Sequence, residues 1–136
     1  MSKAIPQIRK YMTAAPHTIG HDQTLASAQN MMRELRIRHL PVLDGGRLVG
    51  VLTERDVALI ETLKDVDPKN VQVSDAMSQQ VYTVSPDGPL DEVAAEMAEH
   101  KYGSAVVMDN NHVVGVFTTV DGMSALSELL QSRLAK

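Results

Sequence analysis

Two short stretches of this sequence place a hydroxyl and a carboxylate where together they could hold a small molecule. Thr53 is followed three residues later by Asp56, and Thr118 is followed by Asp121 at the same spacing. Each threonine ends an apolar stretch typical of a strand, and each aspartate falls where a helix should begin. A helix start attracts anions through its unpaired N–H groups, and an ionised carboxylate can accept both hydroxyls of a cis-diol. The pattern therefore indicates a candidate cradle for a nucleotide.

The same spacing also has a simpler structural interpretation. A threonine just before a helix can accept a hydrogen bond from the backbone of the first turn, which caps the helix. The two roles are compatible, and the residues alone leave both open.

A basic cluster precedes the first copy of the pattern: Arg33, Arg36, Arg38 and His39. Cations near the end of a helix complement its dipole, and this is sufficient to explain Arg33 and Arg36. Arg38 and His39 lie beyond that last turn, so they are candidate contacts for a phosphate.

Evidence for metal binding or catalysis is thin. His17 and His21 have the spacing of helical metal ligands, but Pro16 and Gly20 lie beside them and no His-Glu-x-x-His motif is present. The sequence also lacks a Gly-x-Ser-x-Gly elbow, a Walker A loop and a Gly-x-Gly-x-x-Gly fingerprint. We therefore predict no metal site, no catalytic residues and no required cofactor, and we do not expect an enzyme.

The composition excludes several classes of protein. The 136 residues contain no cysteine, which excludes disulfides and thiolate chemistry, and 43% are hydrophobic, as is ordinary for one compact globular domain. No apolar run approaches the roughly 20 residues of a membrane span, and the N-terminus lacks a secretory signal, so we expect a cytoplasmic protein without membrane contact. The formal net charge of −4 disfavours nucleic acid as a partner.

An internal duplication organises the chain. Residues 12–59 align with residues 77–124 at a constant offset of 65 without a gap, and 13 of the 48 pairs are identical. Average composition would give about three identities by chance. The chain is therefore a repeated unit.

Each repeat shows the same order of predicted elements. A short apolar turn (8–12 and 73–77) precedes an extended piece, a helix with one apolar face (25–35 and 90–97), a hairpin (40–53 and 105–118) and a second helix (56–63 and 121–134). Pro41 places its strand at a sheet edge or at the start of the strand, and Pro89 suits a first helical position. Residues 64–72 are the predicted linker. We infer an α/β (α+β) fold in which two β-α-β-β-α units pack sheet against sheet as one domain, because each unit alone has little core.

By these features the chain resembles a tandem pair of cystathionine β-synthase (CBS) domains, the arrangement called a Bateman module. The resemblance is carried by the strand Leu40-Pro41-Val42-Leu43-Asp44 and by the Gly-x-x-Thr-x-x-Asp pattern in both repeats. It covers residues 8 to about 130, with repeats at 8–63 and 73–130.

The resemblance implies a regulatory module that binds AMP, ADP, ATP or S-adenosylmethionine in clefts between the repeats and acts on a separate, unidentified effector protein. It also implies a homodimer. In the family the aspartate of the pattern binds the ribose diol, the threonine helps to hold phosphate, the extended piece flanks the base, and residues just before the first hairpin strand meet phosphate. Carried over to this sequence, the candidate ligand-binding residues are Thr18, Ile19, Arg38, His39, Thr53, Arg55, Asp56, Thr83, Val84, Ser104, Thr118 and Asp121.

The two repeats differ at these positions. The second has Gly103 and Ser104 where the first has Arg38 and His39, and Val120 where the first has Arg55. We therefore expect unequal affinities, with a phosphorylated ligand favouring the Thr53/Asp56 side. The alternative from another class is a structural or dimerisation module with vestigial clefts, which the apolar stripe of the last helix and the eight methionines favour.

Overall fold

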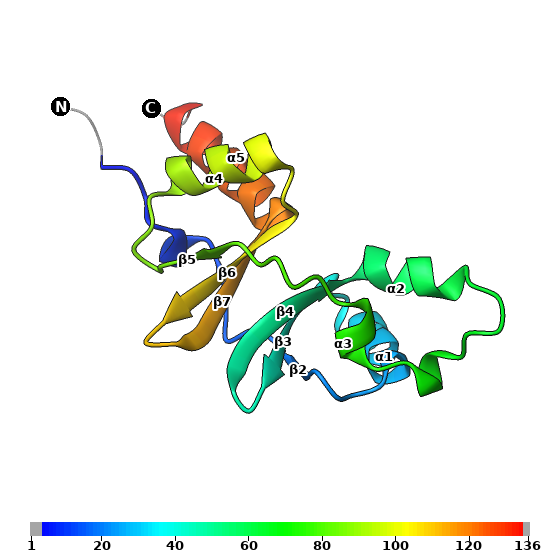
Figure 1. The fold of residues 1–136 in the computed structure, drawn as a ribbon. Helices are drawn as coiled ribbons and strands as arrows, with labels where there is room; N and C mark the ends of the chain where they lie inside the picture. Colours follow the sequence, from blue (N-terminus) through cyan, green and yellow to red (C-terminus); the bar gives the residue numbers. More distant parts are fainter. Residues whose placement is uncertain (1–3, 135–136) are drawn as a thin grey trace. The chain divides into compact units, whose positions relative to one another are not determined.

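The computed structural model describes residues 4–134 and divides the chain into two compact units (Figure 1). One unit comprises residues 17–81. The other combines the segment up to residue 16 with the chain from residue 82 onward. Each has its own sheet and its own hydrophobic core, and the fold is mixed α+β.

The unit of residues 17–81 contains a three-stranded sheet in the order β2-β3-β4. Strand β2 runs parallel to β3, and β3 and β4 form an antiparallel hairpin. Its elements are β2 (Ile19–Gly20), α1 (Leu25–Leu35), β3 (His39–Asp44), β4 (Arg47–Thr53), α2 (Glu54–Glu61), the 3₁₀ helix η2 (Pro68–Asn70) and α3 (Val73–Ala76). The core joins Leu25 and Met32 of α1 to Leu40, Leu52 and Val57.

The other unit contains a four-stranded sheet in the order β1-β7-β6-β5. Its elements are the 3₁₀ helix η1 (Ile8–Lys10), β1 (Thr13–Ala14), β5 (Thr83–Val84), α4 (Leu90–His100), β6 (Ser104–Asp109), β7 (His112–Thr118) and α5 (Thr119–Leu134). Phe117, the single phenylalanine, is 1% exposed and lies in the core with Leu90, Val93 and Met97 of α4.

The leading segment of each sequence repeat packs within the unit formed by the other repeat. Thr13 of β1 pairs with Val116 of β7, and Ile8 is fully buried in the core of the same unit. The segment that follows α3 makes the matching bridge, where Ser78 pairs with Val51 of β4. Sequence repeats and compact units are therefore offset, and each core needs a helical turn from the other repeat.

This exchange explains the glycine at the head of each Thr-x-x-Asp pattern. A Cβ on Gly50 would lie 2.6 Å from the Met77 sulfur and 2.7 Å from the Ser78 carbonyl oxygen. A Cβ on Gly115 would lie 2.5 Å from the Met12 sulfur. The repeated methionines thus close directly over the repeated glycines.

Both hairpins turn as the sequence predicts. Gly45 and Gly46 have positive φ angles of 58° and 84°, and Asn110 and Asn111 have 51° and 65°. Two consecutive left-handed residues are what a tight primed turn requires, and glycine and asparagine tolerate them.

Three local expectations are wrong. The second helices begin at Glu54 and Thr119, two residues earlier than expected, because Thr53 itself is the N-cap of α2. Pro89 is the N-cap of α4 and not its first residue. Pro41 lies within β3, the central strand of its sheet.

Pro41 is tolerated in the central strand for a geometrical reason. It faces Val51, whose backbone N–H and carbonyl bond Ser78 on the far side of β4, so this pair exchanges no hydrogen bonds across the hairpin. In the other sheet the equivalent residue, Val106, directs its N–H outward to the Tyr82 carbonyl (2.9 Å). A proline at this position therefore lacks only the hydrogen bond that points away from the hairpin, and the hydrogen bonds between the two hairpin strands are kept.

Among the described residues, no helix is long and apolar enough to cross a membrane.

Candidate functional site

The turn between β4 and α2 closes as a capping box. Thr53 Oγ1 accepts a hydrogen bond from the Asp56 backbone N–H (3.1 Å), and Asp56 Oδ2 accepts one from the Thr53 N–H (2.9 Å). The structural interpretation of this pair is therefore confirmed. Within residues 4–134, the other carboxylate oxygen, Asp56 Oδ1, has no hydrogen-bond partner. One oxygen of a half-buried carboxylate thus remains available beside a helix start.

The equivalent turn between β7 and α5 is more fully satisfied. Asp121 Oδ2 accepts hydrogen bonds from the Thr118 N–H (2.9 Å) and hydroxyl (3.2 Å), and Thr118 Oγ1 accepts one from the Asp121 N–H (3.2 Å). The Thr13 hydroxyl also lies 3.3 Å from Asp121 Oδ1 and 3.4 Å from Oδ2. Both oxygens of Asp121 are therefore engaged.

Thr13 is a residue that the sequence analysis missed. Its counterpart 65 residues later is Ser78, so both repeats carry a hydroxyl at this position. The Ser78 hydroxyl instead donates to the Gln80 carbonyl (3.3 Å), so it makes no hydrogen bond to Asp56. A hydroxyl retained in both repeats was the available signal, but the partner of Thr13 depends on the exchange of leading segments.

The cations predicted for the first repeat gather at the start of α2. His39 faces Thr53 across the β3–β4 hairpin, and the Arg38 carbonyl accepts a hydrogen bond from the Glu54 N–H (2.9 Å). Arg38 Nε also lies 3.4 Å from Glu54 Oε2, although both side chains are largely exposed, at 76% and 64%. Such an exposed pair contributes about 0–1 kcal/mol, so an anion can compete for the guanidinium.

The second repeat keeps the backbone arrangement without the cations. Ser104 faces Thr118 across the β6–β7 hairpin, and the Gly103 carbonyl accepts the Thr119 N–H (3.1 Å) as Arg38 does for Glu54. Arg55 lies on the exposed first turn of α2. The residue at the same position in α5 is the apolar Val120, so this cation is also missing from the second repeat.

The extended pieces lie on the other side of each central strand. Ile19 pairs with Val42 in parallel, and Thr83 pairs with Val106 in the same way. Ile19 is 5% exposed and belongs to the core, so its backbone, and not its side chain, is what a ligand could meet. Thr18 and Val84 are half-buried and Thr83 is exposed.

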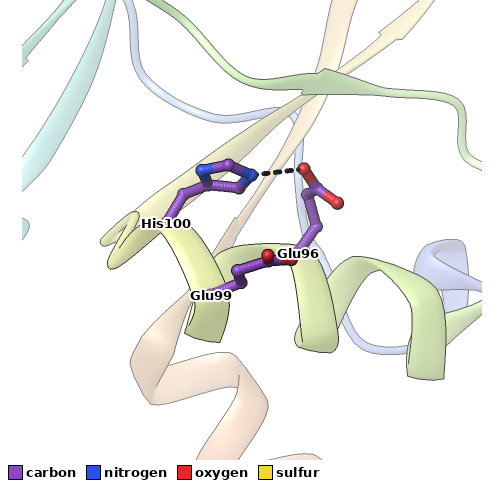
Figure 2. Close-up of side chains that lie close together, drawn as sticks. All are labelled: Glu96, Glu99 and His100. Atoms are coloured by element: carbon purple, nitrogen blue, oxygen red, sulfur yellow. Dashed lines mark ion pairs between the residues drawn. The ribbon is translucent and has the colours of Figure 1, made fainter.

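Three side chains on α4 lie close enough to share a cation: Glu96, Glu99 and His100 (Figure 2). Their ligand atoms lie within 4.8 Å of one another, and Glu96 Oε1 is 2.8 Å from His100 Nε2. All three are exposed, and the ion pair accounts for their approach. The two histidines weighed in the sequence analysis are not part of this set, and His21 contacts Asp44 at 3.3 Å.

An aromatic stack lies beside the same helix. The His100 ring stacks on Tyr102 with centroids 5.1 Å apart, and Tyr82 lies 5.2 Å from Tyr102 on a tilted plane. Burial raises the pKa of the Tyr82 hydroxyl above its ordinary value of 10.0, and the charge of Glu96 raises it further. This stack has no counterpart in the first repeat, where His17 and Ile37 take the tyrosine positions.

Two β-α-β-β-α repeats, each with a capped Thr-x-x-Asp turn after its hairpin, define the class as a tandem-repeat α+β protein. The sequence model of the CBS domain matches residues 8–60 and 73–128. The chain therefore belongs to the CBS domain family.

Known proteins agree with this assignment. The CBS domain-containing protein YhcV of Bacillus subtilis is 30% identical over 114 residues, which cover 84% of this chain and 81% of YhcV. The crystal structure of AcuB from Vibrio cholerae, named for acetoin utilization, is 28% identical with a TM-score of 0.86 and covers 98% of each chain. The CBS domain pair of protein MJ0100, solved with 5′-methylthioadenosine and S-adenosylmethionine, is 26% identical with a TM-score of 0.77 and covers 96% of this chain and 99% of that one.

Proposed function

We propose that this chain is a regulatory module that binds an adenosine-containing ligand (AMP, ADP, ATP or S-adenosylmethionine) and modulates a separate partner protein. Membership of the CBS family supports the proposal, as do the two adenosine compounds bound by the similar MJ0100 pair. The observation that carries it is Asp56 Oδ1 beside the start of α2, which has no hydrogen-bond partner among residues 4–134. The location of the ligand between the repeats, their sheet-to-sheet packing and the cytoplasmic setting stay predictions.

Each residue of the first repeat has a distinct role in this proposal. Asp56 Oδ1 accepts a ribose hydroxyl, while Oδ2 keeps the capping bond to Thr53 that holds the carboxylate in place. A phosphate takes the place of Glu54 on the Arg38 guanidinium, next to His39 and the positive end of the α2 dipole. Regulation then requires that the ligand bind two conformations of the module with different affinity.

Isothermal titration with AMP, ATP and S-adenosylmethionine tests this function. At least one of them should bind well below millimolar concentration. Asp56→Asn should weaken it at least tenfold, because the amide offers one acceptor where the carboxylate offers two, and a tenfold loss corresponds to about 1.4 kcal/mol.

Asp65→Asn is the matched control. Asp65 lies in the same unit, is exposed and has a positive φ of 63° that asparagine tolerates, so the same change of charge should leave affinity unaltered. Asp121→Asn should have the smaller effect, since Asp121 is already satisfied by Thr118 and Thr13. Absence of binding by all three ligands would contradict the proposal.

Helix α5 favours a second candidate function, assembly into a homodimer. Val120 and Met123 are each 65% exposed, and Leu126 and Leu130 continue the same apolar face of α5, with Leu129 at its edge. Exposed apolar patches of this kind commonly mark interfaces. Light scattering should give a dimer mass that Met123→Glu lowers to the monomer, while Ser132→Glu, on the opposite face of the helix, leaves it unchanged. A monomeric wild-type protein at tens of micromolar would contradict this function.

A further inference from the structure

A pocket of about 390 Å³ lies within the unit of residues 17–81, between α1 and α2. This volume falls in the range of small-molecule sites. Glu54, Val57 and Glu61 line it from one face of α2. Asp56 is not among the lining residues, so the pocket is not the ribose end of the proposed nucleotide site.

The base of the pocket is apolar. Met32 and Val57 are 7% and 5% exposed and belong to the core, and Ile37 is half-buried and packs against it. A ligand placed here meets hydrocarbon below it. The base therefore suits an organic group, with little to offer a bare inorganic ion.

The rim of the pocket is cationic. Arg33 lies in the last turn of α1, Arg36 is its C-cap in the left-handed conformation (φ 55°), and Arg38 follows two residues later. Arg33 and Arg36 are three residues apart, which places neighbouring side chains on one side of a helix end. Three arginines from a short stretch of chain therefore line the pocket.

The charges on the rim are only partly balanced. Arg38 pairs with Glu54, and Glu61 accepts a hydrogen bond from the Gln29 amide (2.7 Å). Arg33 and Arg36 have no ion pair or hydrogen bond from their side chains to any residue in the described range 4–134. Two guanidinium groups with five N–H donors each match the charge and the acceptors of one phosphate dianion.

The dipole of α1 favours a cation at the helix end but does not require three arginines. Lys101 occupies the same left-handed C-cap position in α4 (φ 60°), so one cation at the helix end is common to both repeats. The other two arginines are not: Ala98 and Gly103 stand at the positions of Arg33 and Arg38. The base differs as well, since Gly122 replaces Val57. The fold does not require these residues.

We propose that this pocket binds a small organic phosphate beside the Thr53/Asp56 turn, at a site that adjoins the proposed nucleotide site through Arg38 and Glu54. Arg33 and Arg36 hold the phosphate monoester, and its organic part lies over Met32, Ile37 and Val57. The site adds a second class of ligand to the first, and Asp56 is not among the residues that line it.

Phenyl phosphate is the probe, because it joins a dianion to an apolar ring. The test is a titration of the isotopically labelled full chain at pH 8, monitored by NMR at the arginine Nε–Hε and backbone resonances. We expect saturable shifts at Arg33 and Arg36, with inorganic phosphate binding at least fivefold more weakly and phenol producing no shift there. Equal affinity for phenyl phosphate and inorganic phosphate would overturn the proposal, because the apolar base would then contribute nothing.

Variants separate this pocket from general charge effects. Arg33→Gln combined with Arg36→Gln should weaken phenyl phosphate at least tenfold, while Arg47→Gln, an exposed arginine of the same unit, should leave its affinity unchanged. Unaltered backbone spectra show that each variant is folded. Undiminished binding by the double variant, or shifts confined to Thr53 and Asp56, would overturn the proposal. AMP binding lost in Asp56→Asn, with phenyl phosphate binding retained, would show two independent sites.

Discussion

The two units of this chain share a frame and differ in what they present to a ligand. Both have a glycine covered by a methionine, a hairpin with two left-handed residues, and a Thr-x-x-Asp turn that caps the following helix. In the unit of residues 17–81 this frame carries Arg33, Arg36 and Arg38, and Asp56 Oδ1 has no hydrogen-bond partner within the described part of the chain.

The other unit carries acidic side chains, whereas the unit of residues 17–81 carries these arginines. Its helix α4 carries four acids, Asp91, Glu92, Glu96 and Glu99. The aspartate of its Thr-x-x-Asp turn, Asp121, accepts a hydrogen bond from the Thr13 hydroxyl. Repetition within one chain thus separates two kinds of residue. Residues kept in both repeats, Asp56 and Asp121 included, build the shared frame, and residues that differ, such as Arg38 and Gly103, distinguish what each unit offers a ligand.

The largest expected effect concerns the frame. Gly50→Ala should lower the free energy of unfolding by about 2–3 kcal/mol, because the new Cβ would meet the Ser78 carbonyl oxygen at 2.7 Å and backbone cannot easily move aside. Gly115→Ala should cost less, since its backbone neighbour, the Thr13 carbonyl oxygen, is 3.1 Å away and only a flexible methionine is closer. Urea unfolding of both variants measures the difference.

Gly122→Ala is the control for the first prediction. Its Cβ would lie 3.6 Å from the Phe117 ring, an ordinary contact, and Gly122 lies within α5. Alanine should therefore stabilise the protein by about 0.5–1 kcal/mol. If Gly50→Ala were also neutral or stabilising, steric contact with Met77 and Ser78 would not explain why glycine occupies this position.

The next prediction concerns the one position where the two central strands differ in backbone chemistry. Val106→Pro should cost about 1–2 kcal/mol, because it removes the outward N–H that bonds the Tyr82 carbonyl. Pro41 shows that the strand accommodates the ring itself. Thermal unfolding should show the loss, whereas Val107→Ala reports side-chain packing alone. A Val106→Pro variant as stable as wild type would mean that the outward bond contributes nothing.

Local signals predicted most of the fold. Strands, turns and helices could be read because glycine and asparagine at 45–46 and 110–111, and the apolar spacing of α1 and α4, act over a few residues. Errors arose where the outcome depends on a distant partner. Pro41 in a central strand is acceptable only because Val51 bonds Ser78 and not the proline, and no local rule contains that fact.

The candidate site was predictable to the same extent. The threonines and aspartates were found through their spacing, and the structure adds that both pairs are capping boxes or close equivalents. Thr13 beside Asp121 could not be found, because it reaches that turn only through the exchange of leading segments. The pocket of Arg33 and Arg36 was missed for a related reason: it exists between two helices, and spacing along one helix gives only the dipole interpretation.

The smallest expected effect concerns Tyr82, which lies in the unit that contains the acidic helix α4 and has no tyrosine counterpart in the first repeat. Burial raises the pKa of Tyr82 above 10.0, and Glu96 and Glu92, whose counterparts in the first repeat are Met31 and Ser27, raise it further. Above pH 10 the tyrosine of the unfolded chain therefore loses its proton before that of the folded chain. Since the folded state then binds more protons, the free energy of unfolding falls as the pH rises through and beyond 10. Chemical unfolding between pH 8 and pH 11 should show this decline, and Tyr82→Phe, which keeps the ring on Tyr102, should make the decline shallower while leaving stability near pH 8 unchanged. An identical slope in the variant would mean that neither burial nor the acids of α4 raise the pKa of Tyr82, and the electrostatic contrast between the units would then rest on the arginines of the first repeat.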